Sequence, residues 1–324
     1  MPKISVCIPT YNTARYLPEA IESVLRQEFV DYELVICDNA STDETSEICR
    51  SYDDMRVRYV RFEERTNQAG NFNRCLKAAC GEFVTLLHAD DFVLPGFLAD
   101  RVERLEKRAR AGFVFGAVNI VDEKSVVTST SSRWQEDCDF EVGELLYSLV
   151  LGCIVSPPSL MVRRSSVDKI GLFRTDLTWG HDWEWALRLA ERCSGCYASK
   201  PLAAYRVHGE SGTAEQLNAA KNGYQERRIL KETLARLAAS NSRFRKLRRP
   251  ALRALSLRQM YYAQQALLVG LRDVARNNLW YAVRSDVKAI TRPTFWAMFV
   301  ASAGRISWYT HYLTVRNAVV SPGD

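Results

Sequence analysis

Two adjacent carboxylates end an apolar run and give the strongest chemical signal in this chain of 324 residues. In the run VTLLHADD, Asp90 and Asp91 directly follow what reads as a buried strand. Burying two neighbouring carboxylates is costly unless a cation or hydrogen-bond donors compensate their charge. A hard divalent ion, Mg²⁺ or Mn²⁺, that also holds phosphates is the obvious compensator. Strand-end acids also cap helices, so the pair needs support from other motifs.

Other polar side chains follow two earlier apolar runs. Thr10, Tyr11 and Asn12 come after ISVCIP, and Asp38 and Asn39 come after YELVIC. Strands are expected over residues 4–9, 32–37, 57–62 and 83–87, and helices over residues 17–27, 44–52 and 71–79. This alternation predicts an α/β fold with a Rossmann-like, doubly wound and mostly parallel sheet. Because ligands bind beyond the carboxyl ends of such strands, all three polar groups should share one edge.

The end of the chain has a different composition. From about residue 225 the strand signal stops, and helical patterns bounded by Pro250 and Pro293 replace it. Residues 233–324 carry fifteen Lys and Arg against three acids, which leaves the first 232 residues at a net charge of −6. We therefore expect a catalytic domain over residues 1–225 and a basic helical appendage over residues 226–324.

Composition argues against several other classes. The N-terminus enters a strand without the features of a signal peptide, and no run of eighteen apolar residues occurs, which favours a cytoplasmic protein that does not span a membrane. Nine cysteines, two of them at Cys7 and Cys37 inside expected strands, fit reduced thiols better than a disulfide framework. The pair Cys193 and Cys196 lacks a second pair for zinc and is expected to be inert.

Five motifs together resemble the family 2 glycosyltransferases of the GT-A fold. They are SVCIPTYN, LVICDNASTDET, NQAGNFNRCLKAACGEFVTLLHADD, GHDWEWALRLA and YRVHGES, and they span about residues 3–212 in the family's order. The resemblance implies an inverting, metal-dependent transferase that moves a sugar from a nucleotide diphosphate, UDP- or dTDP-linked, to a hydroxyl. The acceptor would be a growing glycan or a lipid-linked glycan, as in cell-surface polysaccharide synthesis.

The resemblance also assigns roles to single residues. Asp91 would bind the cation, with Asp90 contacting ribose or sharing the metal shell, and Asp182 would take the proton of the acceptor hydroxyl. The residues expected around the donor are Thr10, Tyr11, Asn12, Asp38, Asn39, Asn67, Gly70, Asn73, Asp90 and His208. Helix and turn formation is the alternative explanation for many of these, and for Asp182 it is an acid at a helix start.

Some of these roles have a stated chemistry. Asp38 or Asn39 would accept the imide proton of a pyrimidine, and Tyr11 would stack on the base. Gly70 is expected to need a positive φ angle. His208 would reach the diphosphate or metal, with loop hydrogen bonding as the equal alternative. Glu184 should project away from Asp182, because residues two apart on a helix do not share a face.

The chain departs from the family's pattern at two positions. His88 stands where an acid is frequent, and there it would be packing, a partner of a ligand, or a ligand that shifts preference from Mg²⁺ to Mn²⁺. Asn39 stands where a second acid is common, and its side-chain oxygen can still accept a hydrogen bond.

Two other activities compete with glycosyl transfer. A non-catalytic nucleotide-sugar-binding or scaffold protein finds support only in His88. A nucleotidyltransferase would show a glycine-rich basic loop after the first strand, where this chain has PTYNTARYLPEA.

The basic appendage fits an anionic membrane surface better than nucleic acid, since it contains no nucleic-acid reading motif. Its basic run and its aromatic residues favour peripheral binding at the inner face of the membrane. They are Arg243, Arg245, Lys246, Arg248, Arg249, Phe295, Trp296, Trp308, Tyr309 and Tyr312. The alternative to a membrane role is a solvated helical face that packs on the net-negative surface of the catalytic domain.

Overall fold

The computed structural model describes residues 1–209 and 222–303. The chain forms two compact units, of which one comprises Met1–Leu149 with Cys153–His208 and the other Val150–Gly152 with Gly209–Asp324. Trp308, Tyr309 and Tyr312 lie outside the described residues, as do the last two residues of YRVHGES. The division into domains of residues 1–225 and 226–324 stays a prediction.

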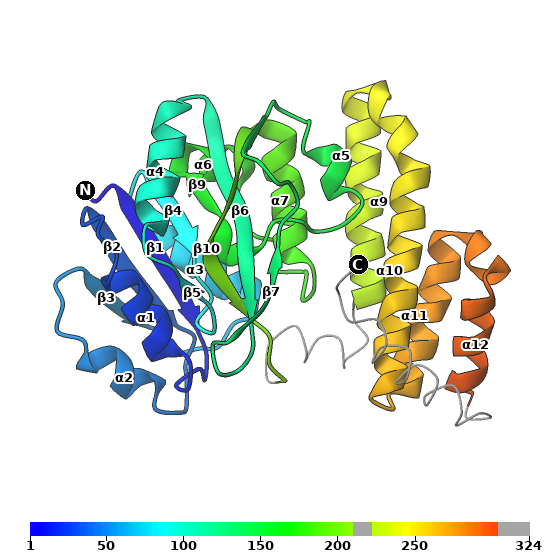
Figure 1. Ribbon diagram of the computed structural model, residues 1–324, viewed down its shortest axis with the longest axis horizontal. Helices are drawn as coiled ribbons and strands as arrows, with labels where there is room; N and C mark the ends of the chain where they lie inside the picture. The colour runs from blue at the N-terminus through cyan, green and yellow to red at the C-terminus, as the bar shows by residue number, and fades with distance from the viewer. Residues whose placement is uncertain (210–221, 304–324) are drawn as a thin grey trace. The chain divides into compact units, whose positions relative to one another are not determined.

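The first unit opens with the expected alternation of strands and helices (Figure 1). The elements are β1 (Ile4–Thr10), α1 (Leu17–Leu25), β2 (Tyr32–Asp38), α2 (Thr45–Ser51), β3 (Val57–Arg61), α3 (Gln68–Ala78) and β4 (Phe83–Leu86). Helix α3 begins before the expected Asn71, because the side chain of Asn67 accepts a hydrogen bond from the Gly70 backbone and caps the helix.

The rest of this unit adds shorter and mixed elements. They are β5 (Phe92–Val93), α4 (Phe97–Lys107), β6 (Ala111–Val121), β7 (Val127–Ser131), β8 (Cys138–Phe140), α5 (Leu146–Leu149), η1 (Pro157–Ser159), β9 (Met161–Arg163), α6 (Arg164–Ile170), α7 (His181–Arg192) and β10 (Ser194–Arg206).

The strands form one sheet in the order β3-β2-β1-β4-β9-β6-β10-β5, with β7 beside β6 and β8 beside β10. Strands β1 to β4 pair in parallel, and so do β6 and β10. Strand β9 is antiparallel to both β4 and β6, and it joins the two parallel parts. This α/β architecture confirms the expected, mostly parallel sheet, and it brings the ends of β1, β2 and β4 to one edge.

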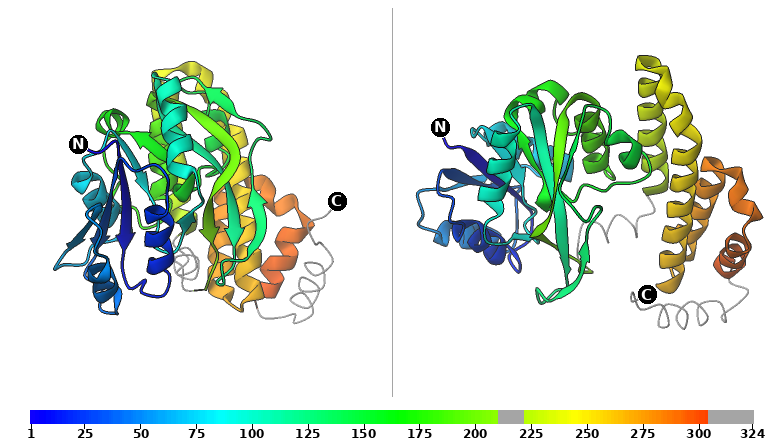
Figure 2. Two further views of the ribbon diagram at one scale, coloured as in Figure 1. Left: turned by 60° about the vertical axis from the view of Figure 1, so that its left-hand side comes forward. Right: turned by 45° about the horizontal axis from the view of Figure 1, so that its top comes forward.

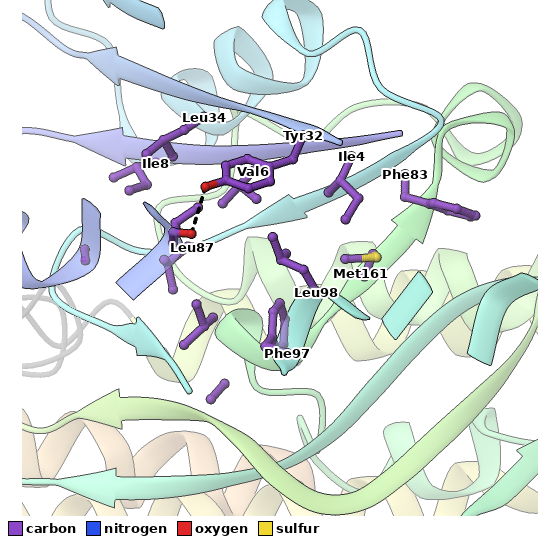
Figure 3. Close-up of a cluster of buried hydrophobic side chains, with 14 of the residues drawn as sticks. Ile4, Val6, Ile8, Tyr32, Leu34, Phe83, Leu87, Phe97, Leu98 and Met161 are labelled. Carbon is purple, nitrogen blue, oxygen red and sulfur yellow. Dashed lines mark hydrogen bonds between the residues drawn. The ribbon is translucent and has the colours of Figure 1, made fainter. Parts of the chain in front are cut away.

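Helices cover both faces of the sheet (Figures 1 and 2). On one face, side chains of α1 and α4 pack on Val6 and Leu34 in a fully buried core (Figure 3). The Tyr32 hydroxyl donates to the backbone oxygen of Val24, 3.0 Å away, and so satisfies the one polar atom of that ring. On the other face, Cys7 of β1 lies against α3, where its thiol donates to the Cys75 carbonyl. None of the nine cysteines, which all fall within the described ranges, forms a disulfide.

The described part of the second unit is helical. It contains α9 (Asn222–Ser240), η2 (Ser242–Leu247), α10 (Arg248–Leu268), α11 (Arg272–Ser285), η3 (Val287–Thr291) and α12 (Pro293–Ser302). Pro293 begins α12, as expected, and Pro250 stands at the start of another helix, also as expected. Pro250 lies in the first turn of α10, where a missing backbone N–H costs no intrahelical hydrogen bond. Among the helices of residues 1–209 and 222–303, none is long and apolar enough to cross a membrane.

We expect Gly81→Ala to destabilise the strand that carries the acid pair. A Cβ atom at Gly81 would stand 2.5 Å from the backbone nitrogen of Ser5 and 2.6 Å from the carbonyl carbon of Ile4, and backbone atoms cannot move aside cheaply. The free energy of unfolding should fall by about 1–3 kcal/mol. Chemical denaturation followed by circular dichroism measures this. Gly209→Ala is the matched control, since the described residues leave its Cβ position open. Equal stability of the two variants would contradict the prediction.

Candidate active site

The loops after β1 and β2 are tied to each other by Asn12. This residue adopts a left-handed backbone conformation with φ of 51°, in which a short polar side chain is tolerated. Its backbone N–H donates to the Ser41 hydroxyl at 3.0 Å, and its side-chain oxygen accepts the Thr42 N–H at 2.8 Å. Thr10 is buried, and its hydroxyl pairs with that of Thr13. These bonds hold the loops after β1 and β2 together at this edge of the sheet. The donor contacts of Thr10 and Asn12 stay predictions.

Asp38 is fully buried, and both of its carboxylate oxygens accept hydrogen bonds. One oxygen accepts the Ser41 N–H at 2.8 Å. The other accepts the Tyr59 hydroxyl at 2.6 Å and the Arg61 guanidinium at 2.9 Å. The charge of Asp38 is thus balanced by Arg61, and the bond to Ser41 holds the loop that follows β2. Recognition of a base imide by Asp38 stays a prediction.

Asn39 uses its amide to bind the segment before α3. It donates to the Thr66 carbonyl at 2.8 Å and accepts the Thr66 N–H at 2.9 Å, as a neighbouring strand would. Arg74 also donates to the same oxygen at 2.8 Å. An acid at this position could accept but not donate, so the departure from the common pattern adds one hydrogen bond to the frame.

Tyr11 carries an arginine on its ring. The guanidinium carbon of Arg65 lies 3.9 Å from the ring centroid, which is cation–π geometry. Sequence patterns did not single out Arg65, because it falls in a short polar stretch without periodicity. The cation and the aromatic face together form a surface suited to a base or a phosphate.

Asn73 of α3 and Asn67, which caps this helix, hold the segment that precedes α7. Asn73 accepts the Phe173 N–H at 2.8 Å and donates to the Phe173 carbonyl at 2.9 Å, while Asn67 donates to the Thr175 carbonyl at 2.7 Å. The expected positive φ angle at Gly70 is wrong. Gly70 lies inside α3, and a Cβ atom there would collide with the Thr66 side chain, so close packing is the reason for glycine.

Asp91 is buried at the end of the β4 loop, with one oxygen satisfied and the other not. Its Oδ1 accepts the backbone N–H of Arg206 at 2.9 Å. Its Oδ2 has no hydrogen-bond partner within the described residues. Burial, and then the charge of Asp90, raise the pKa of Asp91 well above the ordinary value. Without added positive charge, an ionised Asp91 is unfavourable here.

Asp90 has a more favourable environment. Although burial favours its neutral form, a hydrogen bond from His208 lowers the pKa of Asp90. The distance between His208 Nε2 and Asp90 Oδ2 is 3.0 Å. The His208 ring also packs against Tyr16, with centroids 4.7 Å apart. The motif histidine therefore binds an acid of the pair directly.

His88, Asp90 and Asp91 offer three ligand atoms that lie within 4.8 Å of one another. The Nε2 of His88 is buried and has no hydrogen-bond partner among the described residues, and its Nδ1 lies 3.6 Å from Asp91 Oδ2. Two carboxylate oxygens suit Mg²⁺ or Mn²⁺, and an imidazole nitrogen suits Mn²⁺ better. The orphaned atoms of Asp91 and His88 are what a divalent cation would satisfy, so these residues fit one.

Asp182 is the second residue of α7, and Gly180, with a φ of 70°, precedes the first turn of this helix. Its Oδ1 accepts the neighbouring Trp183 N–H at 2.8 Å. Asp182 and His88 line the same cavity, which is otherwise apolar. Glu184 points elsewhere, as expected, and forms an ion pair with Arg188 at 2.9 Å.

The apolar wall of this cavity escaped the sequence analysis. Phe173 stacks on Trp185 with ring centroids 4.7 Å apart, and Phe72 stacks on His88 at 5.3 Å. Neither contact falls within a single helix or strand, so spacing could not predict them. Phe72, Phe173 and Trp185 line the cavity that Asp182 also lines.

Three kinds of comparison agree with this geometry. The model of the family "Glycosyl transferase family 2" matches residues 5–171. An uncharacterized glycosyltransferase of Rickettsia typhi is 29% identical over 222 residues, which are 67% of this chain and 68% of the relative. A Campylobacter jejuni enzyme, GalNAc(5)-diNAcBac-PP-undecaprenol beta-1,3-glucosyltransferase, is 29% identical over 231 residues, 69% of this chain and 71% of that protein.

Solved structures share the fold. S. aureus TarS residues 1–349, in complex with UDP-GlcNAc, has a TM-score of 0.66 at 17% identity, covering 99% of this chain and 93% of that one. A mannosyltransferase from Pyrobaculum calidifontis, in complex with GDP-Man and Mn²⁺, has a TM-score of 0.54 at 19% identity, covering 98% and 85%. The family match extends over more than half of the sequence, and the architecture is that of the GT-A transferases. The chain therefore belongs to glycosyltransferase family 2.

Proposed function

We propose that the protein is an inverting glycosyltransferase that moves a sugar from a nucleotide diphosphate to a hydroxyl acceptor. The observation that carries the proposal is the unpartnered, buried oxygen of Asp91, in a cluster whose His88 shares a cavity with Asp182. A cation would explain the first feature and a base the second. A nucleotide-sugar-binding scaffold that had lost turnover could still use the cation to hold the donor, but it would have no use for the base, which disfavours that alternative.

In this proposal Asp91, Asp90 and His88 hold a divalent cation. When bound, the cation supplies positive charge that stabilises a departing diphosphate. The chain's own residues do the rest. Asp182 accepts the proton of the acceptor hydroxyl, whose oxygen forms the new bond to the sugar as the bond to the diphosphate breaks. Attack from the face opposite the leaving group inverts the anomeric centre.

The donor is a nucleotide sugar, and UDP- or dTDP-linked sugars are the preferred candidates. TarS and the mannosyltransferase were solved with UDP-GlcNAc and GDP-Man, respectively, which supports the donor class without choosing the base. A hydrolysis screen of the purified protein against nucleotide sugars, with Mg²⁺ or Mn²⁺, tests the proposal. Failure of every donor under both metals would count against it.

The acceptor is proposed to be a glycan on a lipid carrier, as in cell-surface polysaccharide synthesis. The Campylobacter relative is named for an undecaprenol-linked substrate, and the basic appendage supports a position next to an anionic membrane. We propose a cytoplasmic enzyme bound peripherally to the inner face of that membrane.

Asp91→Asn should separate stability from function. Asparagine still accepts the Arg206 N–H but removes the uncompensated charge. The raised pKa of Asp91 means that its contribution to stability is present at low pH and is lost as pH rises through that pKa. At pH 8 the metal-free variant should therefore be more stable than wild type by roughly 1 kcal/mol or more.

The same variant should lose donor affinity more than about 10-fold in the presence of Mn²⁺. Denaturation curves and calorimetric titration with the donor give the two readouts. Asp168→Asn, an exposed acid of α6, is the control and should change neither. Unchanged metal-dependent affinity in Asp91→Asn would remove Asp91 from the site.

Asp182→Asn should leave donor affinity nearly intact while turnover falls roughly 10²-fold or more, because only proton abstraction is lost. The asparagine oxygen can keep the hydrogen bond from Trp183, so the start of α7 should be preserved. Initial rates and donor titrations are measured side by side. Glu184→Gln, which disturbs the Arg188 ion pair instead, should retain turnover per folded molecule. Near-normal turnover of folded Asp182→Asn would reduce this residue to a helix-start acid.

A further inference from the structure

Three helices of the second unit bring basic side chains together. Helices α9, α10 and α11 lie side by side (Figures 1 and 2). We call the basic cluster the set formed by Arg227, Lys231, Arg248 and Arg284. Arg227 anchors it, because its Nε and Nη2 donate to the Arg284 carbonyl at 3.2 and 2.9 Å. This carbonyl lies at the end of α11, so the bond holds two basic residues of different helices in one place.

The acids of the helical unit do not neutralise the basic cluster. Residues 222–303 contain only Glu226, Glu232, Asp273 and Asp286 as acids. The first three pair with Arg258, Arg228 and Arg276, and Asp286 caps η3 by accepting the Lys288 N–H. Within the described chain, the four members of the basic cluster therefore form no ion pair.

This proximity of like charges is unfavourable in the free protein. The pKa of Lys231 is lowered, first by the charge of Arg227 and also by those of Arg284 and Arg248. Lys231 follows Arg227 by one helical turn on α9, a spacing at which like charges destabilise a helix. An anion that contacted several of these groups would relieve the repulsion.

Exposed apolar side chains continue from the basic cluster along the chain. Arg284 stacks on Trp280, with the guanidinium carbon 4.4 Å from the ring, and half of the Trp280 side chain is exposed. Val287 and Ile290 of η3 are exposed, and Trp296 and Phe299 of α12 are about half exposed. Trp296 also donates to the Ile290 carbonyl at 2.8 Å. Cations beside half-exposed tryptophan are typical of surfaces that meet the boundary between water and lipid.

We propose that the basic cluster binds the phosphate groups of anionic lipids and that the adjacent apolar side chains enter the lipid interface. The occupant is thus a bilayer rather than a soluble anion, because the cations and the apolar residues are neighbours. This inference rests on the proposed membrane position. It assigns lipid binding to the basic cluster, which shares only Arg248 with the basic run Arg243–Arg249.

The test compares two double variants of the full chain in co-sedimentation with vesicles. Lys231→Gln with Arg284→Gln removes two members of the basic cluster. Arg253→Gln with Arg272→Gln, both exposed, on α10 and α11, makes the same change in net charge elsewhere. Vesicles contain phosphatidylcholine with or without phosphatidylglycerol. Wild type and the control should bind the anionic vesicles alike at low salt. The cluster variant should bind about 30-fold more weakly, since each basic residue near such a surface contributes about 1 kcal/mol.

Each other outcome decides against the inference. Equal weakening of both variants would mean that net charge alone acts, and the basic cluster would be no site. If wild type binds a DNA duplex and the cluster variant does not, while both bind anionic vesicles equally, the basic cluster would be a site for another polyanion. If wild type ignores anionic vesicles, the membrane position and the basic cluster both fail, while sugar transfer to a water-soluble acceptor remains measurable. Lys231→Arg with Arg284→Lys should retain binding, which excludes misfolding as the cause of loss.

Discussion

The hydrogen bond from the Arg206 backbone to Asp91 is the constraint on which the rest of the site depends. It joins the end of β10 to the loop after β4, two segments more than a hundred residues apart in sequence. The Arg206 side chain strengthens the same junction, since it donates to the carbonyls of Asp90 and Asp122 at 2.8 and 3.1 Å. The buried guanidinium of Arg206 offsets part of the charge of the acid pair, but it does not contact Asp91 Oδ2.

Around this junction, most polar side chains of the motifs stabilise the loops of the site. Asp38, Asn39 and Asn12 form hydrogen bonds with residues of these loops. Within residues 1–209 and 222–303, the buried side-chain atoms of the motifs that lack a hydrogen-bond partner are few, and they include Asp91 Oδ2 and His88 Nε2. Such a division is what a preorganised site requires, because ligands bind best to groups that do not move on binding. It also explains why a family motif can be long while its reactive atoms are few.

The sequence was sufficient for the first half of the sheet, where strand and helix periods alternate and each element packs on its sequence neighbour. It was not sufficient for β9, a strand of three residues whose place between β4 and β6 is decided by distant partners.

Within the site, the acids and His208 could be found because they stand in motifs. Arg65 and the aromatic residues of the cavity could not be found, because their contacts depend on the folded structure and produce no recognisable spacing in the sequence. Gly70 was found for the wrong reason, since its tight contact with Thr66 is invisible until α3 is placed.

The pair of hydrogen bonds between Asn73 and the backbone of Phe173 has a consequence for local unfolding. Through these bonds a side chain of α3 takes the part of a neighbouring strand for the segment that leads to Asp182. The segment cannot open without breaking them, and α3 cannot fray there without releasing the segment. The Phe173 amide should therefore exchange its hydrogen with solvent together with the amides of α3, as one cooperative unit rather than as a surface loop.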